Sequence, residues 1–93
     1  MMNLPIVFGD VVRTLRKENG HTQERFANVC GINRTYMTDI EVGRRRPTIE
    51  VCRRICVGLN IELSTLFVAI EAAGYSVLLP QQRPESDLST PDS

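Results

Sequence analysis

The chain has 93 residues, no formal net charge, 42% hydrophobic and 24% charged residues, and no tryptophan. This length indicates one small domain, and no apolar run approaches the roughly 20 residues that a membrane span needs. The N-terminal segment M-M-N-L-P-I-V-F-G-D lacks a basic stretch followed by a long apolar one, which argues against a signal peptide. We therefore expect a cytoplasmic protein with no membrane partner.

The zero net charge hides a strong asymmetry along the chain. Between Arg13 and Arg54 there are ten basic and five acidic residues, a net charge of +5. From Asn60 onward there are five acidic residues and only Arg83, a net charge of −4. A basic middle with an acidic end is compatible with a polyanion-binding face, although an ordinary solvated surface would look the same.

Apolar spacing and helix caps predict an all-α fold of five helices. Phe8, Val11, Val12 and Leu15 repeat at i, i+3, i+4 and i+7, which places them on one helical face. Capping residues, Gly stops and further apolar stripes give the other boundaries. The predicted helices cover residues 6–19, 23–30, 34–42, 49–59 and 63–73.

Apolar residues of the four later helices are expected to complete a compact core. Residues 1–79 would form the domain, with Tyr75–Pro80 as a short strand or an extended arm. Residues 80–93 are rich in Pro, Ser and acids, which predicts a disordered acidic tail. The residues expected to point inward from the later helices are Phe26, Ala27, Cys30, Met37, Ile40, Ile49, Cys52, Ile55, Cys56, Leu59, Leu63, Leu66, Phe67 and Ile70.

Two short helices joined by Gly31-Ile32-Asn33 fit the helix-turn-helix arrangement, in which the second helix enters the major groove of DNA. The first turn of that helix contains side chains that can read base edges. Arg34 can bond guanine O6 and N7 together, and Asn33 and Thr35 can contact bases in similar ways. Asn33 is a helix cap in the first place, so its base contact stays open. Thr38, one turn beyond Arg34, could also reach DNA.

Other residues of this region are suited to the phosphate backbone. Gln23 begins a helix, where its amide and the free N–H groups beside it could clamp a phosphate. Arg44, Arg45 and Arg46 follow the second helix directly. Alone they could form a solvated loop, but their position after the motif favours phosphate contact.

Metal binding and catalysis are poorly supported. Structural zinc requires four ligands, whereas Cys30, Cys52, Cys56 and His21 lack the paired spacing. Buried small hydrophobic residues explain the cysteines better, with a thiol sensor at Cys30 as a minor alternative. There is no phosphate-binding glycine loop, HExxH or G-x-S-x-G motif, so we expect no enzyme, no cofactor, no metal and no small-molecule ligand.

The segments L-R-K-E-N-G-H-T-Q-E-R-F-A, C-G-I-N-R-T-Y-M-T-D-I-E, G-R-R-R-P-T and L-N-I-E-L-S-T-L-F lie in register from Phe8 to Phe67. Together they resemble the lambda-repressor/Cro-type (XRE-like) helix-turn-helix family. The N-R-T-Y turn and the small size are also similar to the controller proteins of restriction–modification systems. Phe26 replaces the usual aliphatic residue, and Val42 stands where a polar residue is common.

The resemblance implies a five-helix, lambda-repressor-like DNA-binding domain with a short C-terminal extension. It implies a homodimeric transcription regulator that binds double-stranded DNA at a palindromic operator. Arg34, Thr35 and Tyr36 would face the groove, although Tyr36 could instead be an aromatic residue at the core edge. Arg16 and Glu41 would form a structural ion pair.

The dimer would bury apolar residues of the last helix and the segment after it. An alternative function is a protein-interaction module, such as an antitoxin or an anti-repressor partner, which the acidic tail motivates. The residues expected at the dimer interface are Val68, Ile70, Tyr75, Val77, Leu78 and Leu79.

Overall fold

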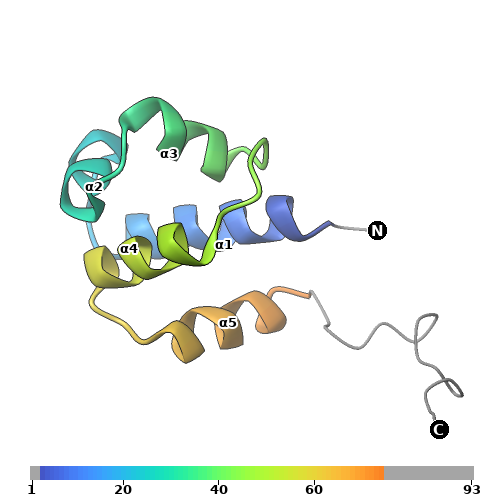
Figure 1. The fold of residues 1–93 in the computed structure, drawn as a ribbon. Helices are drawn as coiled ribbons and strands as arrows, with labels where there is room; N and C mark the ends of the chain where they lie inside the picture. The colour runs from blue at the N-terminus through green and yellow to red at the C-terminus, as the bar shows by residue number, and fades with distance from the viewer. Residues whose placement is uncertain (1–2, 75–93) are drawn as a thin grey trace, which may run out of the picture.

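Five helices stack in three levels in the structure, a computed structural model that describes residues 3–74. α3 lies on one side of α1 and α5 on the other, with α4 beside α1 (Figure 1). The predicted five-helix, all-α fold is confirmed for the described residues. The helices are α1 (Leu4–Glu18), α2 (Gln23–Cys30), α3 (Arg34–Glu41), α4 (Ile49–Leu59) and α5 (Leu63–Ala72).

Side-chain caps explain where four of the helices begin. The side chains of Asn3, Thr22, Asn33 and Thr48 accept hydrogen bonds from backbone N–H groups that have no partner inside the helix. The Asn3 cap makes α1 start at Leu4, two residues before the predicted start. The sequence signal for this start is an Asn followed by a Pro in the first turn.

Glycine allows α1 and α3 to cross closely. A Cβ on Gly9 would overlap the carbonyl oxygens of Ile40 and Glu41, so no larger residue fits without moving the helices. The backbone of α3 therefore rests directly on α1. This contact fixes the distance between α3 and α1 and the angle at which they cross. α3 is the helix predicted to enter the groove of DNA.

A second glycine brings α2 and α4 together. A Cβ on Gly58 would overlap the Sγ atom of Cys30. Glycine has a low helical propensity, but here it allows the two helices to pack closely. All three cysteines are buried free thiols, as the interpretation as small hydrophobic residues predicted. α3 thus packs closely against α1 at Gly9, and α2 packs closely against α4 at Gly58.

The core largely follows the predicted apolar pattern, with three differences. Val7 was not predicted but is fully buried, because it lies one turn before Val11 on the inner face of α1. Ile49 was expected in the core, yet it is 67% exposed because it borders an open groove that no other element fills among the described residues. Phe67, also expected inside, is 44% exposed. Within residues 3–74 no single helix could cross a membrane, and α4 and α5 have the necessary length only as a pair bent by 96°.

Candidate nucleic-acid interface

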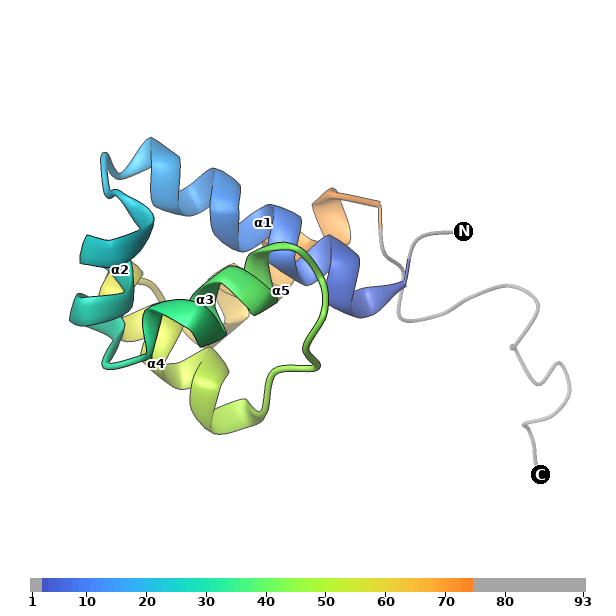
Figure 2. The same ribbon diagram turned by 90° about the horizontal axis from the view of Figure 1, so that it is seen from above.

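The turn between α2 and α3 has the geometry of a helix-turn-helix. Gly31 adopts a left-handed conformation with a φ of 68° and ends α2. Ile32 packs against the core, and Asn33 caps α3. Seen from above, α3 lies over α1 and α4, and the following loop runs along one side of it (Figure 2). One long face of α3 is thus left without another part of residues 3–74 above it.

The first turn of α3 presents its polar side chains to solvent. Arg34 and Thr35 are exposed, and Arg34 has no ion pair among the described residues. Asn33 uses its Oδ1 atom to accept from the N–H groups of Thr35 at 2.8 Å and Tyr36 at 3.2 Å. Asn33 is therefore a helix cap, and only its amide NH2 group is left for a further contact.

A buried ion pair anchors the far end of α3 to α1. Arg16 donates to Glu41 from Nε to Oε2 at 2.7 Å and from Nη2 to Oε1 at 3.0 Å. Arg16 also donates from Nη1 to the backbone oxygen of His21 at 2.9 Å. The side chains are only 10% and 2% exposed, so this is a desolvated, two-pronged pair of the kind that tolerates no loss of one partner.

Gln23 connects this ion pair to the middle of α3. Its Nε2 donates to Glu41 Oε1 at 3.1 Å, and its Oε1 accepts from Thr38 Oγ1 at 2.6 Å. Both ends of the Gln23 amide are therefore engaged inside the protein. The backbone N–H groups of the first turn of α2 remain suited to a phosphate, whereas the Gln23 side chain holds α2 and α3 together.

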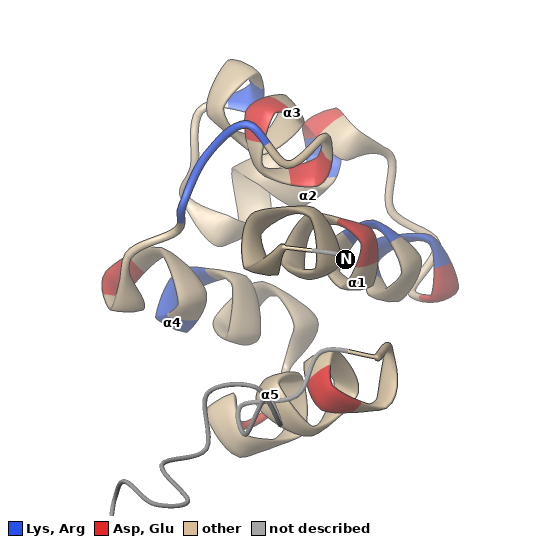
Figure 3. Cartoon of the chain, turned by 90° about the vertical axis from the view of Figure 1, so that its right-hand side faces the viewer, with Lys and Arg blue, Asp and Glu red and all other residues tan. Residues whose placement is uncertain are grey.

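The three arginines after α3 make different contacts. Arg44 Nη1 lies 2.7 Å from Asp39 Oδ1, and Arg45 Nε lies 3.4 Å from Asp39 Oδ2. The Arg45 guanidinium carbon is also 4.8 Å from the centre of the Tyr36 ring, a cation–π distance. Arg46 instead lines a groove beside α1. Figure 3 shows the basic loop as the blue segment that joins α3 to α4.

Tyr36 combines the two alternatives that the sequence left open. It is half-buried and packs against the core, as an aromatic residue at the core edge would. Its ring also carries Arg45, so the remaining part of the side chain belongs to the surface around the exposed face of α3.

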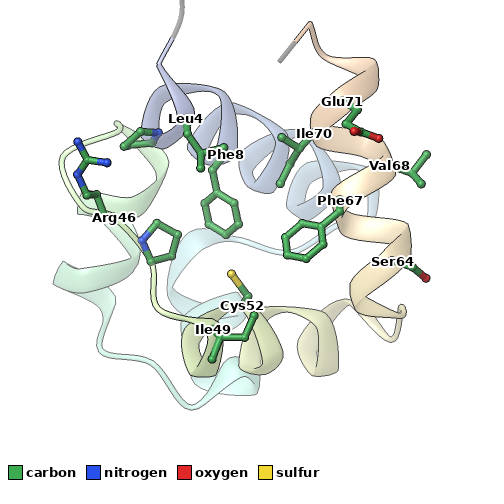
Figure 4. A pocket seen from close by; sticks show the side chains of 12 residues that line it. Leu4, Phe8, Arg46, Ile49, Cys52, Ser64, Phe67, Val68, Ile70 and Glu71 are labelled. Atoms are coloured by element: carbon green, nitrogen blue, oxygen red, sulfur yellow. The ribbon is translucent and has the colours of Figure 1, made fainter. Parts of the chain in front are cut away.

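A groove of about 710 Å3 lies on another side of the molecule, between α1, α4 and α5 (Figure 4). Exposed apolar residues border it, among them Leu4, Ile49, Phe67 and Val68, of which Val68 is 62% exposed. Ile70, predicted at the interface, is only 4% exposed because it lies one turn after Leu66 on the inner face of α5, and it lines this groove. The other predicted interface residues, Tyr75, Val77, Leu78 and Leu79, lie outside the described residues. Phe67 was missed as a surface residue.

The cysteines are poor candidates for metal or redox chemistry. No group of three or more His, Cys, Asp or Glu residues within residues 3–74 could hold a metal ion. Burial, and to a lesser extent the neighbouring Cys56, raises the pKa of the Cys30 thiol to about 12. Because the thiolate is the reactive form, Cys30 is held in its unreactive state in the folded chain.

Comparison with known proteins agrees with this geometry. A family model described as Helix-turn-helix (HTH_3) matches residues 12–66. The control protein C.MunI from Mycoplasma sp. is 40% identical over 72 residues, which cover 76% of this chain and 97% of that protein. The chain therefore belongs to the XRE-like helix-turn-helix family of transcriptional regulators.

Solved structures of restriction–modification controller proteins are among those that share this fold. The restriction–modification controller protein C.AhdI from Aeromonas hydrophila is 32% identical, with a TM-score of 0.65 over 68% of this chain and 96% of that chain. The controller protein C.Esp1396I, solved as a tetramer in complex with its natural 35 base-pair operator, is 29% identical. Its TM-score is 0.72 over 78% of this chain and 96% of that chain. The predicted family resemblance is confirmed, and these relatives are regulators rather than enzymes.

Proposed function

We propose that this protein binds double-stranded DNA sequence-specifically, as a homodimer on a palindromic operator, and controls a restriction–modification operon. The observation that carries the proposal is the exposed first turn of α3, with Arg34 and Thr35 free in solvent on a helix fastened by a buried ion pair. A rigid helix with exposed base-reading side chains satisfies the requirements of major-groove recognition.

Direct reading would depend on the first turn of α3. Arg34 would bond guanine through two donors, a contact worth ~1–3 kcal/mol of discrimination against the wrong base. Thr35 and the amide of Asn33 would contact neighbouring bases, and Tyr36 would lie beside them. Thr38 already donates to Gln23, which makes it a support of the recognition surface more than a contact.

Phosphate contacts would frame this reading surface. The N–H groups at the start of α2 would face one phosphate, as helix N-termini commonly do. Arg44, Arg45 and Arg46 would follow the backbone on the other side of α3. These contacts would supply affinity and steep salt dependence without sequence information.

The apolar surface of α5 would form the dimer interface. Phe67 and Val68 are 44% and 62% exposed, and both line the groove between α1, α4 and α5. A second copy related by a two-fold axis would cover this surface and place two copies of α3 about 34 Å apart, one turn of DNA. The similar protein C.Esp1396I forms a complex with its operator as a tetramer, which supports DNA binding by more than one copy of this chain.

Selection of bound duplexes from a random-sequence pool tests the proposal. We expect an enriched site with two inverted half-sites whose centres are one helical turn apart. Titration of that duplex should show binding of two chains. Enrichment of no sequence, or of a single half-site bound by one chain, would contradict the proposal.

A further inference from the structure

Asp39 places a carboxylate between α3 and the basic loop that follows it. It pairs with Arg44 at 2.7 Å and with Arg45 at 3.4 Å. The Asp39 side chain is only 16% exposed, whereas those of Arg44 and Arg45 are 68% and 52% exposed. Asp39 is thus a largely buried anion that pairs with two of the three arginines of the loop.

Arg45 extends this cluster to Tyr36. Tyr36 and Asp39 are three residues apart and so lie on the same face of α3. The Arg45 guanidinium contacts both, with its carbon 4.8 Å from the centre of the Tyr36 ring. Asp39 is therefore connected to the loop directly and, through Arg45, to the Tyr36 ring in the first turn of α3.

An anion here has a predictable effect on binding to DNA. Arginines that contact phosphates strengthen binding because they release the condensed counterions of the duplex. An arginine that must first leave a carboxylate exchanges one anion for another, so its net contribution is smaller. The Asp39 carboxylate also repels nearby phosphates. Both effects act on every duplex, whatever its sequence.

We infer that Asp39 adds to the selectivity that Arg34 provides, because it restrains Arg44 and Arg45 from indiscriminate phosphate binding and holds Tyr36 in one orientation for the operator. This inference rests on the proposed function. Non-specific binding depends on phosphates alone and is weakened by the restraint. Operator binding also depends on the ordered Tyr36–Arg45 surface, so it benefits from the same residue.

The test is Asp39→Asn, which removes the charge and keeps the size. Fluorescence anisotropy at several salt concentrations would measure binding to the selected operator and to a random-sequence duplex. For the random duplex we expect affinity to rise roughly tenfold and the log–log salt slope to steepen by about 1–2, the change expected when two arginines become free. Operator affinity should rise less, so that the selectivity ratio falls at least about threefold.

Glu50→Gln is the matched control. The Glu50 carboxylate in the first turn of α4 also pairs with two arginines, Arg53 and Arg54, so its loss changes the charge by the same amount and frees the same number of cations. We expect this variant to leave selectivity and salt slope near those of the wild type. Equal effects of the two substitutions would mean that net charge alone acts, and would overturn the inference.

Two further measurements keep the outcome decisive. Adding Arg45→Gln to Asp39→Asn should remove most of the gained non-specific affinity. In the otherwise wild-type chain, Arg45→Gln should flatten the salt slope on random DNA less than Arg46→Gln does, even if Asp39→Asn does not fold. An equal or larger flattening by Arg45→Gln would overturn the inference. If the wild type prefers no sequence, the proposed function itself fails, and the inference fails with it.

Discussion

The guanidinium of Arg16 and the carboxylate of Glu41 form two parallel hydrogen bonds, of 2.7 and 3.0 Å, although 25 residues separate them in the chain. They join the last turn of α1 to the last residue of α3. Gln23 adds a hydrogen bond to the same carboxylate from the start of α2. One buried acid thus ties together the three helices that hold the recognition surface.

Breaking this pair from one side should strongly destabilise the fold. We expect Glu41→Gln or Arg16→Met to cost ~3–5 kcal/mol, because each leaves the charge of the other residue buried without a compensating charge. Urea unfolding followed by circular dichroism would measure the loss. The double variant Arg16→Met/Glu41→Leu should recover much of it, since no buried charge remains. A loss below ~1 kcal/mol in both single variants would contradict a desolvated pair.

Arg34→Ala should remove operator preference and leave the fold unchanged. Arg34 is exposed and has no ion pair within residues 3–74. Removing its side chain therefore opens no cavity and leaves no acidic residue without its partner. Gel-shift titration should show operator affinity falling to that of random DNA, with an unchanged thermal midpoint. Arg53→Ala, which removes one arginine from α4, should retain the preference. Unchanged operator affinity of Arg34→Ala would refute this role.

Gly58→Ala should destabilise the chain, although alanine is normally the better helix former by about 1 kcal/mol. The added Cβ would overlap Cys30 Sγ at the crossing of α2 and α4, and such overpacking costs ~1–3 kcal/mol. Combining it with Cys30→Ala removes the overlapping sulfur. Chemical denaturation of the two single variants and the double variant should therefore show a favourable coupling. Purely additive losses would mean that the two positions do not clash.

Phe67→Asp should dissociate the proposed dimer, because it places a charge in the apolar surface that the second copy would cover. Sedimentation equilibrium should show a dimer for the wild type and a monomer for the variant at the same concentration. Operator binding should weaken as well, since binding of one chain would no longer favour binding of a second chain to the other half-site. Thr65→Asp adds the same charge at an exposed position of α5 outside the groove and should have little effect. A dimeric Phe67→Asp variant would move the interface elsewhere.

The buried thiol of Cys30 should resist modification and make stability depend on alkaline pH. Burial raises its pKa from 9.0 to about 12, which lowers the thiolate population at pH 8 roughly a thousandfold. We expect slow reaction with a thiol-specific disulfide reagent in buffer and fast reaction in denaturant. The stabilising contribution of the protonated thiol is complete below pH 9 and is lost as the pH rises toward 12. Rapid modification of the folded chain would instead support a thiol sensor.

Local features were readable from the sequence because each depends on neighbouring residues. The caps Thr22, Asn33 and Thr48 and the stop at Gly31 act within one turn, so the predicted bounds of α2 and α4 agree with the structure. Apolar spacing found most of the core for the same reason. It failed at Ile49 and Phe67, because the period of a helix indicates a face but not whether another element covers it.

Contacts between distant residues were decided only by the tertiary structure. The crossings at Gly9 and Gly58 depend on which backbone or sulfur atom arrives from another helix. Engagement of both ends of the Gln23 amide, and the division of the arginine triplet between Asp39 and the groove, depend on where α3 ends relative to α1. Helix periodicity and capping are set by short-range geometry, whereas pairing of buried polar groups is set by packing of the whole domain.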